Sequence, residues 1–510
     1  MKLSEVIELH LNELNELDKL QNMLIDITPE NIEKVEEYLT TSTFIQTKES
    51  LRQLCYSIAM TLNCRPLKYK QYLSLISFIT PQIQNFFTQD EIVDDIFGHN
   101  SIRLQLLESN AIDFSTIYSY DRSESTFFFF APEFEKFYPD YFCEHEIEFK
   151  NVNLSTHLKL RSEGMNESEL AIIIRNDDID SFQSYVSKLN FNLNGYIPKS
   201  KYEISFYLKS STSLIEYAAF YGSLKIFKFL WMNNVHISDQ LREFAVSGGN
   251  YEIVHILERK QVKFDEDCLN KAIQYHHNEI ARYINETFDV HFTFDTFREC
   301  IMSYNIEMFI EIFNTIENDV NTANDWGWTA LHFATMHGKL DIVKLLCEVD
   351  DINFGDSIDI NVQNLSGVTP LHLASYSGHL YVVKFLVEQP KIDIFKKDDN
   401  GTLPLAYGAN NPQIVAFLCH IKGIDINCQN FQGNSFLHFA ARRGNTEAVK
   451  ILLNIKGINV NLKNEILLAF FLFIEEFDVK FFLNETPLKI ALRKKREIIV
   501  QLLQKCGGTI

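Results

Sequence analysis

The chain has 510 residues, of which 46% are hydrophobic and 23% charged, a balance that is ordinary for a folded protein and excludes disorder over most of its length. Its formal net charge of -21 opposes a general attraction to nucleic acid or to an anionic membrane, because both depend on clustered Lys and Arg. Nine scattered cysteines without a Cys-x-x-Cys spacing favour reduced thiols and a cytoplasmic location over a disulfide framework or a metal site.

Residues 1–160 show helical patterns but no internal repeat. The first twenty residues mix leucine with charged residues and lack the apolar centre of a signal peptide. Farther on, apolar residues recur at helical spacing in four segments: Ile32–Leu39, Leu51–Leu62, Tyr69–Ile79 and Ile102–Leu107. We therefore expect residues 1–160 to form a helical N-terminal region of unknown function.

Residues 161–320 contain a weak repeat. Four similar segments begin at intervals of 27, 28 and 28 residues: Leu214–Gly222, Leu241–Gly249, Leu269–His277 and Phe297–Asn305. Each has the length of a short helix followed by a turn, so the spacing predicts a series of helix pairs. The segment Leu170–Asp178 is expected to begin this series.

A clearer motif recurs from residue 325 onward. Five segments carry all or part of it: Asp325–Ala334, Leu365–Ala374, Asn400–Leu405, Phe431–Ala440 and Glu485–Ala491. In the second of them a threonine can cap the first helix, and Pro370 fits the first helical position. Glycines such as Gly378 are expected to end that helix, and segments such as Leu380–Leu386 and Thr446–Leu453 to form the returning one.

Thr369–Ala374 reads Thr-Pro-Leu-His-Leu-Ala, which at a period of about 33 residues resembles the ankyrin repeat. The resemblance implies an all-α fold, a helical solenoid of stacked helix-turn-helix units with short β-hairpins such as 358–364 and 424–430. We expect ankyrin repeats over residues 321–510 and degenerate ankyrin-like helix pairs over 161–320. The whole arrangement is similar to protozoan ankyrin proteins in which a helical region of unknown function precedes the repeats.

His332, His372 and His438 recur at one position of the motif. Equivalent positions of stacked helices lie about 8–10 Å apart, which is too far for two histidines to share a metal ion. We therefore expect these side chains to form hydrogen bonds near the helix caps, and we expect no metal or cofactor.

A stacked array presents hairpin tips and the ends of its first helices to partners, so these positions carry the predicted binding residues. The candidate set is Trp326, Trp328, Met336, His337, Tyr376, Phe431, Gln432, Arg442 and Arg443. Exposed Trp, Tyr and Arg are common anchors of protein interfaces, although the tryptophans could instead pack between hairpins. The expected function is that of a scaffold that binds another protein.

Two alternatives remain open. Arg442 and Arg443, with the basic run 493–496, could attach the chain to nucleic acid or to a membrane surface by charge. The repeats could also localise an activity that resides in residues 1–160. The sequence contains no phosphate-binding loop, no His-Glu-x-x-His and no Gly-x-Ser-x-Gly, so we expect no catalytic residues and no enzyme.

Residues 466–482 interrupt the last repeat, because deleting them restores the motif directly before Thr486. Their apolar start, Ile466–Ile474, is too short for a membrane span, which needs about 20 residues. One interpretation is an error of the gene model, such as a retained intron. The other is a genuine hydrophobic docking loop.

Overall fold

The computed structural model describes residues 3–93, 98–146, 149, 152–188, 191–203, 205–208, 211–315, 322–348, 358–464 and 485–509. Within these ranges the chain is helical, with three isolated β-bridges and no strand, so the predicted all-α fold is confirmed. The described helices include none that is long and apolar enough to cross a membrane. The chain divides into two compact units, residues 15–311 and residues 1–14 with 312–510. The predicted interruption at 466–482 lies outside the described residues.

The described residues of the N-terminal part form the helices α1 (Leu3–Ile25), α2 (Ile32–Thr41), α3 (Lys48–Cys64), α4 (Tyr69–Phe86), α5 (Gln89–Glu91), α6 (Asn100–Glu108), α7 (Phe114–Tyr120), α8 (Glu124–Phe129), α9 (Ala131–Phe137), α10 (Pro139–His145) and α11 (Leu154–Glu163). A 3-10 turn, η1 (Pro66–Lys68), joins α3 to α4. The four helices predicted here, α2, α3, α4 and α6, are confirmed.

An aromatic core holds α7 to α10 together. The four consecutive phenylalanines Phe127–Phe130 are all buried, because α8 ends at Phe129, α9 begins at Ala131, and neighbouring aromatic side chains cover this junction. Phe114 packs edge-on against Phe134, with ring centroids 5.0 Å apart. A run that is buried on every side has no helical period, which is why the sequence pattern did not indicate these short helices.

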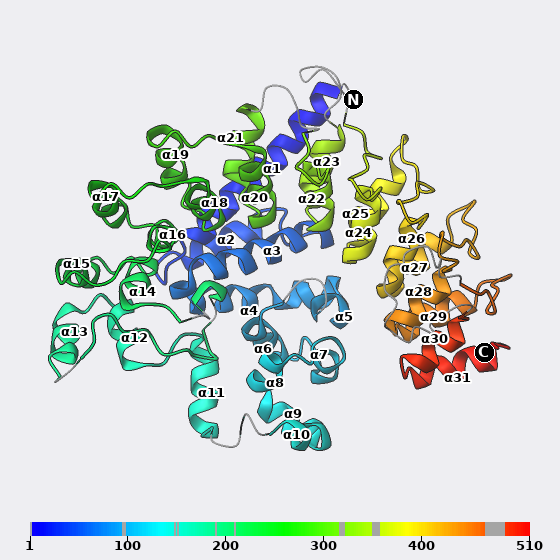
Figure 1. The fold of residues 1–510 in the computed structure, drawn as a ribbon, viewed down its shortest axis with the longest axis horizontal. Helices are drawn as coiled ribbons and strands as arrows, with labels where there is room; N and C mark the ends of the chain where they lie inside the picture. Colours follow the sequence, from blue (N-terminus) through cyan, green and yellow to red (C-terminus); the bar gives the residue numbers. More distant parts are fainter. Residues whose placement is uncertain are drawn as a thin grey trace, which may run out of the picture. The chain divides into compact units, whose positions relative to one another are not determined.

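Five helix pairs follow: α12 (Glu169–Arg175) with α13 (Ile179–Val186), α14 (Leu214–Phe220) with α15 (Leu224–Met232), α16 (Leu241–Gly248) with α17 (Tyr251–Arg259), α18 (Glu266–Gln274) with α19 (Asn278–Thr287), and α20 (Phe294–Ser303) with α21 (Ile306–Thr315). The first helices of α12 to α20 stack in chain order (Figure 1). Small residues permit this: a Cβ on Gly248 would lie 2.0 Å from the Ala219 carbonyl oxygen. The predicted series of helix pairs, beginning near Leu170, is confirmed.

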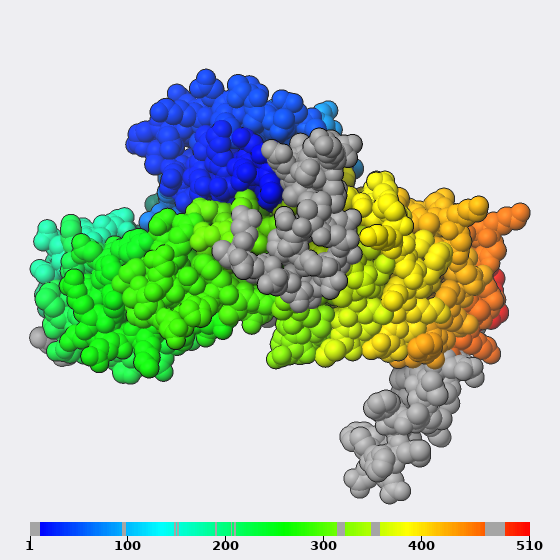
Figure 2. Space-filling model, turned by 90° about the horizontal axis from the view of Figure 1, so that it is seen from above, coloured from blue at the N-terminus to red at the C-terminus, as the bar shows by residue number. Residues whose placement is uncertain are grey.

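The downstream pairs have the same order: α22 (Ala330–Met336) with α23 (Leu340–Glu348), α24 (Pro370–Ser377) with α25 (Leu380–Glu388), α26 (Pro404–Tyr407) and the 3-10 turn η5 (Gly408–Asn410) with α27 (Pro412–Cys419), α28 (Phe436–Arg443) with α29 (Thr446–Leu453), and α30 (Pro487–Arg493) with α31 (Glu497–Lys505). Figure 2 shows the surface of residues 358–464 passing from yellow to orange in chain order, as a one-dimensional stack requires.

We call the first helix of each pair the inner helix. Thr369 caps the inner helix α24, Pro370 occupies its first position, and Gly378 ends it with a φ of 86°. The predicted roles of the three residues are confirmed. The inner helix α26 is shorter, because Asn411 must leave the helical region before Pro412 opens α27.

Candidate partner-binding surface

Four tight turns project from the downstream repeats, and we call them the fingers: residues 324–328, 364–368, 398–402 and 430–434. Each begins with Asn or Asp, whose side-chain oxygen accepts hydrogen bonds from the backbone amides two and four residues later. Each contains a glycine whose φ lies between 71° and 75°. The predicted hairpin arms 358–364 and 424–430 contain no strand; they lead into two of the fingers, which are closed by single backbone pairs or isolated bridges.

Backbone hydrogen bonds join the fingers in series. The amide of Leu365 donates to the Trp326 carbonyl at 3.0 Å, that of Asp399 to the Ser366 carbonyl at 3.1 Å, and that of Phe431 to the Asn400 carbonyl at 2.9 Å. A Cβ on Gly367 would lie 2.6 Å from the Asp399 nitrogen. The glycines therefore permit close stacking as well as the left-handed turn.

Large apolar side chains stand exposed at the fingers. Trp326 is 67% exposed and Phe431 is 65% exposed, and Gln432 beside it is also exposed. Leu365, which the sequence analysis did not select, is 72% exposed. Its exposure could have been predicted from the sequence, because Leu365 is an apolar residue within a polar turn. Trp328 instead packs on the inner helix, with its ring centroid 5.2 Å from that of Phe333.

The ends of the inner helices form a second part of the surface. Tyr376 is 46% exposed, and the Arg443 guanidinium lies over its ring at 5.7 Å, across the short helix α26. Met336 and His337 are half-buried. Burial lowers the pKa of His337 to about 4, so this imidazole is neutral at physiological pH.

Arg442 and Arg493 occupy equivalent places at the ends of α28 and α30. Arg442 donates to the Asn434 side-chain oxygen at 3.1 Å, and Arg493 forms two 3.1 Å contacts with the Glu485 carboxylate. Burial lowers the pKa of Arg442, and the positive charge of Arg493 lowers it further. The two groups of cations that the sequence offered together for charge-driven attachment, Arg442 with Arg443 and the run 493–496, thus lie on neighbouring repeats.

The three recurring histidines bridge successive repeats. The Nδ1 atoms of His332, His372 and His438 accept hydrogen bonds from the backbone amides of the cap residues at 3.1–3.2 Å. Their Nε2 atoms each lie 3.0 Å from a carbonyl oxygen of the following repeat. The prediction of hydrogen bonds near the helix caps is confirmed.

In the upstream repeats, the N-terminal helices cover the equivalent ends. The Arg65 guanidinium donates to the carbonyl oxygens of Tyr275 at 2.8 Å and His276 at 3.3 Å, just beyond the end of α18. Next to it, the Cys64 thiol contacts the Gln274 carbonyl at 3.4 Å. Cations are favourable at a helix C-terminus, where carbonyl groups lack partners within the helix.

The same arrangement occurs one repeat later. The Gln21 side chain of α1 donates to the Tyr304 carbonyl at 2.9 Å and accepts from the Ile306 amide at 3.3 Å. Gln21 is almost completely buried. Two successive inner helices of the upstream unit therefore already have a partner at their ends, and this partner belongs to the same chain.

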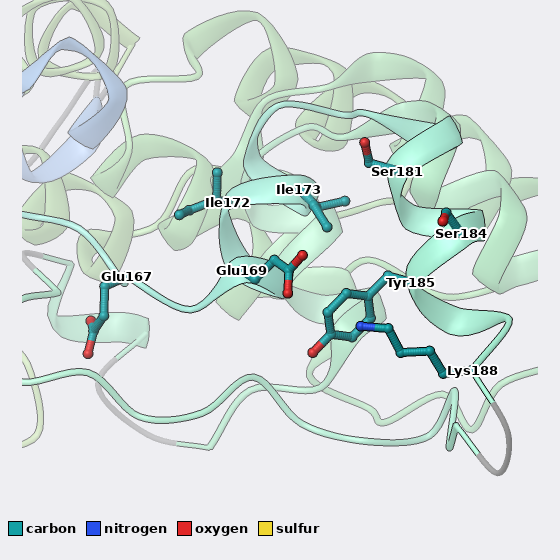
Figure 3. Close-up of a pocket in the computed structure, with 8 residues that line it drawn as sticks. All are labelled: Glu167, Glu169, Ile172, Ile173, Ser181, Ser184, Tyr185 and Lys188. Atoms are coloured by element: carbon teal, nitrogen blue, oxygen red, sulfur yellow. The ribbon is translucent and has the colours of Figure 1, made fainter.

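A pocket of about 440 Å³ lies at the first helix pair, α12–α13 (Figure 3). Its lining residues are Glu167, Glu169, Ile172, Ile173, Ser181, Ser184, Tyr185 and Lys188. The Lys188 ammonium lies over the Tyr185 ring at 4.0 Å. The lining contains neither histidine nor cysteine, and the described residues contain no group of three or more His, Cys, Asp or Glu side chains suited to a metal ion.

Family models match most of the two helical stacks. A model of three ankyrin repeats matches residues 298–398 and again residues 403–510. A model of a domain of unknown function, DUF3447, matches residues 232–312. A search of curated proteins gives no match to the chain. From residue 298 onward the matched repeats coincide with the helix pairs, fingers and bridging histidines described above, so the chain contains ankyrin repeats over residues 298–398 and 403–510.

Proposed function

We propose that this chain is a non-enzymatic scaffold that binds another protein through the fingers and inner-helix ends of its downstream repeats. Ankyrin repeats generally mediate protein–protein interaction. One observation carries the proposal: aromatic side chains of the downstream surface, including Trp326, Tyr376 and Phe431, are exposed, whereas the N-terminal helices cover two equivalent ends upstream. Large exposed aromatic side chains are the usual anchors of interfaces.

All nine cysteines are free thiols, and this supports placing the scaffold in a reducing compartment such as the cytoplasm. The selected residues Trp328, Met336 and His337 are half-buried. These three side chains would pack beneath the exposed aromatic residues and would contribute less area to the contact with the partner.

Site-specific photo-crosslinking on the full chain tests the proposal. A benzophenone amino acid in place of Tyr376 or Phe431 is expected to capture a discrete partner, because both side chains are exposed on the proposed surface. The matched control is the same replacement at Met232, which is 71% exposed on the second helix α15. Equal capture at all three positions, or at Met232 alone, would remove the downstream surface from consideration.

A further inference from the structure

Six cations gather at the ends of two neighbouring inner helices, and we call them the basic patch: Arg442, Arg443, Arg493, Lys494, Lys495 and Arg496. Arg496 connects the two repeats, since its guanidinium lies 3.5 Å from the Arg443 carbonyl oxygen. A Cβ on Gly444 would lie 2.5 Å from the Arg496 Nε atom. The cations thus form one continuous surface in a chain whose net charge is -21.

Carboxylates of the described residues neutralise little of this charge. Glu485 pairs with Arg493, but among the described residues no carboxylate forms an ion pair with Arg443, Lys494 or Lys495. The partial negative charge of a helix C-terminus is about half an elementary charge, so two helix ends offset about one cation in total. The described part of the chain therefore leaves the charges of Arg443, Lys494 and Lys495 without an ion pair.

We propose that the basic patch binds an acidic segment of the partner protein, in an extended conformation, with carboxylates about three residues apart. The proposal rests on the function proposed above and specifies the chemistry of the partner. Successive stacked helices lie about 8–10 Å apart, and an extended chain advances about 3.3 Å per residue, so every third side chain meets the next repeat. An arginine guanidinium can hold a carboxylate through two parallel hydrogen bonds.

The geometry favours a short peptide over a nucleic acid. Duplex DNA carries a negative charge about every 1.7 Å and extends well beyond two repeats, so the rest of a strongly acidic chain would repel it. A peptide segment can end where the basic patch ends. The Tyr376 ring under Arg443 adds an aromatic surface for an apolar side chain of the same peptide.

Fluorescence anisotropy with the full chain tests this proposal. The probe is a labelled peptide of about 15 residues with Glu at every third position among Gly and Ser, measured at about 150 mM salt. The variant Arg443→Glu/Lys494→Glu reverses two exposed charges that have no ion-pair partner among the described residues. It is expected to weaken peptide binding at least about tenfold, because both charge contacts become repulsive.

Lys396→Glu/Lys397→Glu is the matched control, since it changes the net charge equally but lies between α25 and α26, outside the two repeats that carry the basic patch. Equal weakening by both variants, or equal binding of a peptide with Gln for Glu, would overturn the proposal. Tighter binding of single-stranded DNA or of phosphatidylserine vesicles than of the Glu peptide would overturn it in favour of charge-driven attachment. If the Glu peptide does not bind but crosslinking at Tyr376 still captures a partner, the proposed scaffold function stands and the proposal of an acidic partner segment is wrong.

Discussion

Each bridging histidine makes its two contacts only as a neutral imidazole. In His438 the Nδ1 atom accepts from the Ser435 amide and therefore carries no proton, so Nε2 carries the proton and donates to the Glu485 carbonyl. Burial lowers the pKa of His438 to about 4, and the same cause lowers the pKa of His332 to about 4. The repeats are thus joined by imidazole side chains, and protonation in acid removes the Nδ1 acceptor that each of them uses.

We expect acid to destabilise the downstream stack. An unfolded histidine titrates near pH 6.5, so between pH 6.5 and 4 the unfolded chain binds more protons than the folded one. The stability contributed by the His332 and His438 bridges is complete above pH 6.5 and is lost as the pH falls toward 4. For His438 alone this amounts to about 2 kcal/mol between pH 7 and pH 4.5.

Urea denaturation followed by circular dichroism measures this effect. His438→Gln should lower the free energy of unfolding at pH 7 and make its dependence on pH shallower than in the parent chain. The control His291→Gln alters a largely exposed imidazole outside the three bridges and should change the free energy of unfolding at pH 7 little. A pH dependence that is identical in the His438→Gln variant and the parent would contradict this role of the bridge.

At the scale of the element, the finger is fixed by backbone geometry more than by its exposed side chains. Gly367 has a φ of 72° and lies against the backbone of the next finger. Gly457 has a φ of 90°, but a Cβ on this residue would meet no atom within 4 Å. Gly367 is therefore needed both for its left-handed backbone and for the close approach of the next finger, whereas Gly457 is needed only for its left-handed backbone.

Gly367→Ala is expected to destabilise the chain by about 3 kcal/mol, of which about 1–2 kcal/mol is the left-handed backbone and the rest is steric conflict. Gly457→Ala should lower the free energy of unfolding only by the cost of the left-handed backbone, about 1–2 kcal/mol. Urea denaturation of both variants gives the difference directly. If the two variants lose equal stability, the close approach of the fingers contributes nothing.

The ends of the inner helices show why the downstream repeats were easier to predict than the upstream ones. Gly378 and Gly444 signal a left-handed residue in the sequence, and the structure places one at each. Upstream, His276 and Tyr304 adopt the same conformation, with φ values of 53° and 56°, although neither residue type suggests it. Their helix pairs were found only from the 28-residue spacing.

At the scale of the whole chain, the sequence predicted the repeats but not what covers the upstream ones. Arg65 and the carbonyl that it contacts are 210 residues apart, and Gln21 and its acceptor are 283 apart. Nothing in the local pattern around either residue differs from an ordinary surface position. Only the folded chain brings such pairs together, so a single sequence could not identify them.

We expect Arg65→Met to loosen the N-terminal helices from the upstream repeats. The Tyr275 and His276 carbonyls would lose a charged donor, at a cost of about 2–3 kcal/mol. Hydrogen exchange of the full chain should then speed up in α3, α4 and α18 together. Arg122→Met removes an exposed arginine on the C-terminal side of α7 as a control. Faster exchange confined to the residues next to position 65 would argue against a shared opening.

The contact made by Arg65 has an evolutionary implication. Two of its acceptors, at Tyr275 and His276, are main-chain oxygens, which every residue type supplies, so substitution of either of these residues leaves the acceptor in place. A contact of this kind tolerates substitution of the residues that supply the carbonyl groups, but not substitution of Arg65. An internal attachment of this design can persist while the side chains of the repeat that it contacts change.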